Sequence, residues 1–332
     1  MGTADNGVGR NGNGNGFVVP VTGSIDGHIE DFLADCELRG MTPGTIEGYR
    51  SSLRIWSGFL AERGIQPDSG RDHLEVFLRH LRGERGLTHA TLKGYFAVLS
   101  SFYKYLVYKD VVPVNPVLPV RDRYLRTYKK NGNGNGGVSR RVPTTDELAF
   151  MVRCILDPRD RALVMVLAKT GVRRSELIAM DVDDIDWEEG SITLKDRFAK
   201  RSNRVVFFDA ECERSLRQWL KMRERLDTDS PALFVGVGGG GRLKRRGVYD
   251  TVMKHAERVG LHDSNSSKRE DHFGPHSLRY WFTHSLLQAG MRREMVQELR
   301  GDARREAVDI YDRIPRGELR RAYMTFMPEL RV

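Results

Sequence analysis

The sequence contains few cysteines and no long hydrophobic run. Its three cysteines, Cys36, Cys154 and Cys212, lie far apart in 332 residues, and none belongs to a Cys-x-x-Cys pair. Such a sparse, odd set is typical of a reducing compartment and argues against a disulfide framework or a cysteine-based zinc site. No stretch reaches the roughly 18 apolar residues that span a bilayer, and the Gly- and Asn-rich N-terminus lacks the apolar core of a secretion signal. These absences predict a soluble, cytoplasmic protein with no membrane partner.

Positive charge, in contrast, is present in excess. The chain has 54 Lys and Arg against 45 Asp and Glu, a formal net charge of +9, with ordinary hydrophobic (39%) and charged (30%) fractions. Its length is sufficient for two domains, each with its own core. A basic excess favours a polyanionic partner, because neutralised phosphates release condensed counterions. A basic surface kept only for solubility is the alternative that charge alone leaves open.

Two near-identical Asn-Gly tracts, residues 11–16 and 131–136, divide the sequence. Asn-Gly repeats bury no apolar surface and tolerate positive φ, so both tracts are expected to be flexible. The second tract falls between a helical N-terminal half and a mixed C-terminal half, where a linker is expected. The resulting boundaries are a flexible segment at 1–20, a helical domain at 21–120, a linker at 121–140 and a second domain at 141–332.

Apolar residues recur at helical spacing in four segments of residues 22–118. The first segment ends at Gly40. Thr42-Pro43 begins the second, since proline is tolerated in a first helical turn, and Thr88 begins the fourth. The pattern predicts a compact four-helix unit.

The C-terminal half combines helices with a short sheet. An apolar helix at Arg161–Lys169 is expected to end at Gly171. Ser191–Leu194 and Arg204–Phe208 have the composition of strands, and the basic loop Lys195–Asn203 joins them. Helices dominate the remainder. The predicted fold class is therefore mainly α with a small antiparallel β-sheet.

Three separated segments carry side chains suited to phosphate chemistry. They are Thr170–Leu177 with Arg173, His276–Tyr280 with His276 and Arg279, and Leu299–Asp302 followed by Tyr311. Guanidiniums are permanently charged and match phosphate geometry, and they favour the phenolate of a tyrosine whose pKa is ordinarily ~10. Each residue alone has an ordinary alternative: a solvated arginine, a helix-capping histidine, a tyrosine in the core. Together they indicate attack on a phosphodiester without a metal ion.

These segments resemble the motifs of the tyrosine recombinases of the phage-integrase and Xer type, in a two-domain layout over residues 25–320. Thr-Gly-Val-Arg173-Arg-Ser-Glu-Leu is similar to the family's first-arginine box, and His276-Ser-Leu-Arg279 to its His-x-x-Arg box. Asp309-Ile310-Tyr311 resembles the nucleophile segment. The resemblance implies an N-terminal four-helix core-binding (SAM-like) domain and a C-terminal catalytic domain.

The resemblance also implies a role for each matched residue. Tyr311 would attack the scissile phosphate to give a 3′-phosphotyrosine, while Arg173 and Arg279 neutralise the transition state. His276 would assist proton transfer, and Glu176 would support the site. Neither a cofactor, ATP nor a metal ion would be required, because the covalent link conserves the bond energy.

Two assignments are less direct. The family's general-acid lysine lies in the loop between two strands, which places it at Lys200, with Lys195 as the competitor. Where the family usually has Gly-His or Gly-Trp, this chain has Gly301-Asp302. An ionised aspartate cannot donate a hydrogen bond to phosphate and repels it. Three alternatives remain: Asp302 orients an arginine, it is protonated in the site, or another residue supplies the donor.

Basic side chains near these segments, and at the start of the fourth N-terminal helix, are the expected DNA contacts; a solvated surface is the alternative. They are Arg174, Lys195, Arg201, Arg204, Arg242, Lys244, Arg245, His89 and Lys93.

The implied partner is double-stranded DNA carrying recombination sites, in the nucleoid of the cytoplasm. The resemblance implies a homotetramer on two sites, a Holliday-junction intermediate and a mobile-element setting, and it leaves room for accessory DNA-bending proteins. Two alternatives remain. One is a type IB topoisomerase-like enzyme that relaxes supercoils, and the other is a DNA-binding architectural protein without catalysis, for which Asp302 is the best support.

Overall fold

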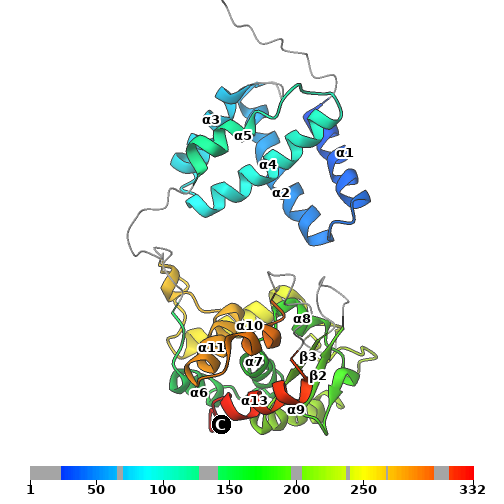
Figure 1. Cartoon of the computed structure of the whole chain (residues 1–332), viewed down its shortest axis with the longest axis vertical. Helices are drawn as coiled ribbons and strands as arrows, with labels where there is room; N and C mark the ends of the chain where they lie inside the picture. The colour runs from blue at the N-terminus through cyan, green and yellow to red at the C-terminus, as the bar shows by residue number, and fades with distance from the viewer. Residues whose placement is uncertain are drawn as a thin grey trace, which may run out of the picture. The chain divides into compact units, whose positions relative to one another are not determined.

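The chain divides into two compact units, Met1–Asn133 and Gly134–Val332 (Figure 1). The computed structural model describes residues 24–65, 70–126, 141–195, 204–236, 240–266, 268–302 and 314–332. Within these ranges no helix has the length and apolar character needed to cross a membrane.

Four helices make up most of the N-terminal unit, as predicted. They are α1 (Ile25–Leu38), α2 (Pro43–Arg63), α3 (Arg71–Arg79) with its π-helical continuation η1 (His80–Glu84), and α4 (His89–Tyr108). The two threonines expected to begin helices do so: Thr42 accepts a hydrogen bond from the backbone N–H of Thr45 and Thr88 from that of Thr91, both at 3.3 Å. Each cap satisfies a backbone donor that the first helical turn leaves unpaired.

The N-terminal core extends further along the chain than the sequence predicts. Two short helices, α5 (Val117–Val120) and η2 (Arg121–Leu125), follow α4, and Leu125 is buried in the same core. Residues 121–125, expected in the linker, therefore belong to this unit. Asn115 holds the turn between α4 and α5 through two hydrogen bonds. Its side chain accepts one from the Val117 backbone N–H at 3.0 Å and donates one to the Ser100 carbonyl oxygen of α4 at 2.9 Å.

The C-terminal unit is built around one buried helix, α7 (Pro158–Thr170). Every residue of α7 from Ala162 to Thr170 is buried, and its main neighbours are α9 and α11. The helices around it are α6 (Thr145–Arg153), α8 (Arg174–Ala179), α9 (Ala210–Arg223), α10 (Arg245–Arg258), α11 (Pro275–Gln288), α12 (Arg293–Arg300) and α13 (Arg316–Phe326) (Figure 1). A helix that is apolar on all sides needs such an enclosure.

A small antiparallel sheet lies at the side of this unit. Its order is β1 (Ile185–Asp186), β2 (Ser191–Leu194) and β3 (Arg204–Phe207), with Ile192 opposite Val206. The predicted hairpin of β2 and β3 is confirmed, and β3 ends one residue earlier than expected. β1 was not predicted, because two residues carry no readable alternation. The sheet places Lys195 and Arg204 at the two ends of the basic loop, whose residues 196–203 lie outside the described residues.

A buried lysine of α7, Lys169, connects residues 328–332 to this helix through hydrogen bonds and ion pairs. The Lys169 ammonium, fully enclosed, donates to Asp209 (2.6 Å), to Glu211 (2.7 Å) and to the Pro328 carbonyl oxygen (2.8 Å). Glu211 in turn accepts from the backbone N–H groups of Leu330 and Val332. The charge on Lys169 is thus matched by two carboxylates, as a buried ammonium requires. This network lies directly before the turn that carries Arg173.

Candidate active site

A glycine turn at the end of α7 directs Arg173 out of the core. Gly171 has φ +60°, and a Cβ atom there would lie 2.3 Å from the ring of Phe282, so the position excludes any other residue without rearrangement. The turn buries Val172 and leaves Arg173 half-exposed as the N-cap of α8. The backbone N–H of Arg173 donates to Glu176 at 2.6 Å, which holds this turn in place.

Arg279 reaches the same place from α11. Its side chain is only 4% exposed, and its guanidinium donates to the carbonyl oxygens of Gly171 and, at 2.9 Å, Arg300. Burial, reinforced by the neighbouring charges of Arg173 and Arg300, lowers the pKa of Arg279 to about 10. The guanidinium therefore remains charged at neutral pH.

The third segment completes the cluster. α12 ends at Gly301, whose φ of +60° turns the chain so that backbone carbonyls face the arginines. Arg173 donates to the Arg300 and Gly301 oxygens, both at 3.3 Å, and to Asp302 at 3.1 Å. Arg279 donates to the same Asp302 oxygen at 3.0 Å, and Arg300 forms an ion pair with the other oxygen at 3.2 Å. Asp302 thus accepts hydrogen bonds from both site arginines.

Arg204 has a different environment from the one the sequence predicts. Its two terminal nitrogens donate to the two oxygens of Glu176 at 2.8 and 3.1 Å, and Nε donates to the Leu299 carbonyl oxygen at 3.2 Å. The side chain is only 10% exposed. We therefore replace the expected DNA contact of Arg204 with an internal role, in which it fixes Glu176 against α12. A strand-end arginine beside a basic loop gives no sequence signal for this role.

Glu176 lies between Arg173 and Arg204 and binds both of them. Its carboxylate side chain is 2% exposed and is bound by both Arg173 and Arg204. Burial opposes ionisation, but the hydrogen bonds and charge of Arg204, with those of Arg173, outweigh it and lower the pKa of Glu176 below its usual value. Glu176 thus binds both the backbone N–H and the guanidinium of Arg173, and its supporting role stays a prediction from the sequence.

Replacing Glu176 by alanine should destabilise the protein by about 3 kcal/mol at neutral pH, because it leaves the nearly buried guanidinium of Arg204 without its counter-ion. The folded pKa of Glu176 lies below the unfolded one, so its contribution is full above the unfolded pKa. It is lost as pH falls through the folded pKa. Urea unfolding of both proteins, repeated from pH 7 downward, should show the difference shrinking in acid.

Glu213→Ala is the matched control, since this carboxylate on α9 pairs with Arg217 alone among the described residues. Its loss should cost no more than about 0.5 kcal/mol. Equal costs for the two substitutions would contradict the assigned role of Glu176.

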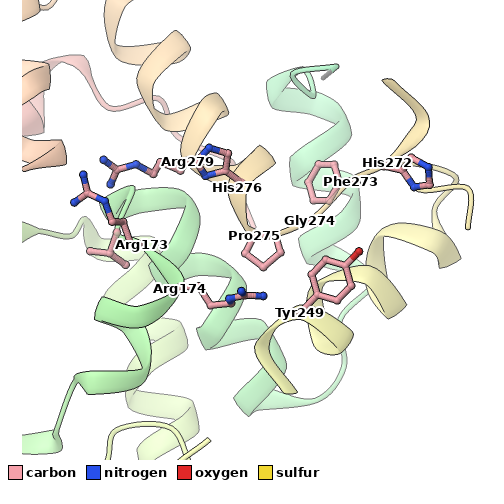
Figure 2. Close-up of a pocket in the computed structure, with 10 residues that line it drawn as sticks. Arg173, Arg174, Tyr249, His272, Phe273, Gly274, Pro275, His276 and Arg279 are labelled. Atoms are coloured by element: carbon pink, nitrogen blue, oxygen red, sulfur yellow. The ribbon is translucent and has the colours of Figure 1, made fainter. Parts of the chain in front are cut away.

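A cavity of about 500 Å³ opens beside the arginines (Figure 2). Arg173, His276 and Arg279 lie at one end of it, and Figure 2 shows Arg174 directed away from this group, toward Tyr249. His276 is exposed in the first turn of α11, with its ring 4.8 Å from that of Tyr280. Tyr249 was not identified from the sequence, because nothing marks one tyrosine of a helix as facing a cavity.

Apart from Lys195, the remaining predicted residues fall into three groups. Arg242 is tied to the protein, since it donates to the Ile178 and Met180 carbonyl oxygens (2.7 and 3.1 Å) and to Asp181 (2.6 Å), which makes it structural. Two pairs of residues are exposed: Lys244 and Arg245 at the start of α10, and His89 and Lys93 at the start of α4. Lys200, Arg201 and Tyr311 lie outside the described residues.

Lys195 has a partner of its own. Its ammonium forms an ion pair with Asp184, a carboxylate whose side chain is 1% exposed. A lysine that donates its proton during cleavage becomes neutral. Lys195 would then leave the buried carboxylate of Asp184 without its counter-charge.

Comparison with known families accounts for most of the chain. The family model described as "Phage integrase family" matches residues 144–316, and the one described as "Phage integrase, N-terminal SAM-like domain" matches residues 29–112. Tyrosine recombinase XerC of Herpetosiphon aurantiacus is 31% identical over 86% of this chain and 90% of its own length. XerC of Corynebacterium glutamicum is 34% identical over 89% and 90%, respectively.

Solved structures share the fold. The Tn1549 transposon integrase in complex with circular intermediate DNA has a TM-score of 0.62 at 17% identity, covering 90% of this chain and 98% of that one. A lambda integrase dimer bound to a COC′ core site has a TM-score of 0.61 at 17% identity, covering 88% and 98%. With these matches, the fold and the gathered arginines lead to one conclusion: the chain belongs to the phage integrase family of tyrosine recombinases, enzymes that cleave and rejoin DNA.

Proposed function

We propose that this protein is a site-specific recombinase whose anion-binding centre is the cluster of Arg173 and Arg279. The observation that carries the proposal is the convergence of both guanidiniums on a single carboxylate oxygen, that of Asp302, at 3.1 and 3.0 Å. A site that binds one carboxylate oxygen with two guanidiniums has the charge and geometry to bind a non-bridging phosphate oxygen. The relatives named tyrosine recombinase XerC support the same reaction.

The reaction exchanges one phosphodiester for another. The Tyr311 oxygen forms a bond to phosphorus, the bond to the 5′ oxygen breaks, and a 3′-phosphotyrosine results. Arg173 and Arg279 neutralise the charge that develops on the non-bridging oxygens. His276, exposed at the same cavity, assists removal of the phenolic proton. Reversal by another strand's 5′ hydroxyl rejoins the DNA, so ATP is not consumed.

Lys200 is the proposed proton donor to the departing 5′ oxygen. The support comes from its competitor, since the Lys195 ammonium is engaged by the buried carboxylate of Asp184. A protonated leaving group avoids an alkoxide, which is the usual purpose of a general acid.

The DNA contacts proposed for this chain are basic residues that line the cavity, are exposed, or belong to the basic loop. Arg174 lines the cavity without a partner in the described part of the chain, and Lys244 and Arg245 are exposed at the start of α10. His89 and Lys93 are the corresponding candidates on the N-terminal unit, and Arg201 on the basic loop. Such contacts supply affinity independent of sequence.

Assembly into a homotetramer on two DNA sites, with a Holliday-junction intermediate, is part of the proposal. Its support is a fold neighbour, a lambda integrase tetramer bound to a Holliday junction, with a TM-score of 0.60 at 15% identity. Accessory DNA-bending proteins and a nucleoid location would follow from the same function.

The test is to trap the covalent complex in EDTA. A pool of nicked, random-sequence suicide duplexes should yield a protein–DNA adduct on Tyr311, since guanidiniums rather than a metal ion supply the positive charge. Sequencing the attached DNA gives the recombination site, and peptide analysis gives the attacking residue.

Three results would count against the proposal. An absence of adduct would leave the architectural alternative, and a strict Mg²⁺ requirement would contradict the mechanism. Rapid relaxation of supercoiled DNA that lacks a partner site would favour the topoisomerase-like alternative.

A further inference from the structure

The two site arginines have almost no free donors. Arg173 uses its terminal nitrogens on Glu176, on two backbone carbonyl oxygens and on Asp302. Arg279 uses three of its four terminal N–H groups on Gly171, on Arg300 and on Asp302. A guanidinium has four terminal N–H groups in a fixed plane. A phosphate bound by terminal N–H groups of both arginines therefore has to replace a bond that Arg173 already makes.

Asp302 is the partner that can be replaced. Glu176 is 2% exposed and is also held by Arg204, and the carbonyl oxygens are fixed by the backbone of α7 and α12. The Asp302 side chain is 30% exposed and makes ion pairs only with arginines among the described residues. It is also the only anion that both Arg173 and Arg279 contact within the described chain.

We propose that Asp302 is a positioning residue that keeps Arg173 and Arg279 aligned in the absence of DNA and is exchanged for the scissile phosphate when DNA binds. The inference rests on the proposed function, since it assigns that phosphate to this pair of arginines. Its carboxylate offers the arginines the same two features as a phosphodiester: one negative charge and oxygen acceptors.

The exchange has an energetic consequence. Without Asp302, Arg173, Arg279 and Arg300 would face one another with little counter-charge, and the buried Arg279 would be the most affected. With Asp302 in place the arginines are preorganised, but each phosphate must compete with a carboxylate that is always present. Asp302 thus lowers the affinity for phosphate while it keeps the arginines aligned. A neutral donor at position 302 would not compete with phosphate in this way.

The experiment measures the affinity of the full-length protein for inorganic phosphate by calorimetry. Asp302→Asn should bind phosphate at least about tenfold more tightly than the wild type, because a hydrogen bond between charged groups contributes that much or more. Asp302→Glu should restore an affinity close to wild type, which a merely structural role would not explain. Adding Arg279→Ala to Asp302→Asn should remove the gain, which places the phosphate at this site.

Glu213→Gln is the matched control, because it removes one negative charge from a side chain that is 32% exposed and outside the cluster. It should leave the affinity unchanged. An Asp302→Asn protein that is folded and binds phosphate like the wild type would overturn the inference; if that variant does not fold, Asp302→Ser provides the same comparison. Phosphate binding needs no cleavage, so this result stands apart from whether the covalent adduct forms.

Discussion

Tyr311→Phe should abolish the covalent DNA adduct and leave noncovalent DNA binding essentially unchanged. The substitution removes one oxygen atom, and that atom is the proposed nucleophile. Without that oxygen the proposed 3′-phosphotyrosine cannot form at this position, so we expect complete loss rather than a reduced rate. Denaturing gel electrophoresis of suicide-substrate reactions measures the adduct, and a mobility-shift titration measures binding.

The controls are two other tyrosines near the site. Tyr249 lines the cavity beside Arg174, and Tyr280 lies one residue after Arg279 with its ring 4.8 Å from His276. Tyr249→Phe and Tyr280→Phe remove the same single oxygen and should retain adduct formation. If Tyr249→Phe abolished the adduct while Tyr311→Phe did not, the nucleophile would have to be reassigned to the cavity wall.

Arg279→Ala should reduce the rate of strand cleavage about 10³-fold, the loss expected when a preorganised donor to a developing negative charge is removed. Arg279 is 4% exposed, and its environment screens the charge far less than water does. Single-turnover cleavage of a suicide substrate at saturating protein measures the chemical step. Thermal unfolding of the same variant separates this loss from instability, because Gly171 and Arg300 each lose a hydrogen bond.

Two comparisons sharpen this result. Arg279→Lys keeps the charge but cannot donate to Gly171, Arg300 and the phosphate in one plane, so it should recover only a small part of the rate. Arg174→Ala, in the same cavity but outside the cluster, should weaken DNA binding with little change in the saturated rate. If Arg174→Ala slowed the chemical step as much as Arg279→Ala, the assignment of the phosphate-binding arginines would be wrong.

The elements that local patterns encode were predictable. Helix starts at Thr42 and Thr88 follow from capping chemistry, and the end of α7 at Gly171 follows from its left-handed conformation. The hairpin of β2 and β3 follows from strand composition. The gathering of Arg173 and Arg279 was predictable for another reason, since the boxes that carry them resemble those of a known family.

Which polar partners these side chains find was not predictable. Arg204 and Arg242 look like their exposed neighbours in the sequence, yet both donate to carboxylates and carbonyl oxygens of the same unit. The choice between a DNA contact and an internal ion pair depends on burial, which a loop sequence does not reveal. Asp302 was recognised as a departure, but its position between two guanidiniums depends on the left-handed turn at Gly301.

The Lys169 network has a consequence for local motion. Residues 328–332 and the Arg173 turn are joined to the same buried helix, α7, one through Lys169 and the other through Gly171. Opening either segment alone would expose a buried ammonium or an arginine backbone to water. The amide hydrogens of Arg173, Leu330 and Val332, each bonded to a buried carboxylate, should therefore exchange slowly with solvent. We therefore expect the Arg173 turn, proposed to bind phosphate, to keep its position in the native state, while the Asp302 side chain, 30% exposed, is the group that moves when phosphate binds.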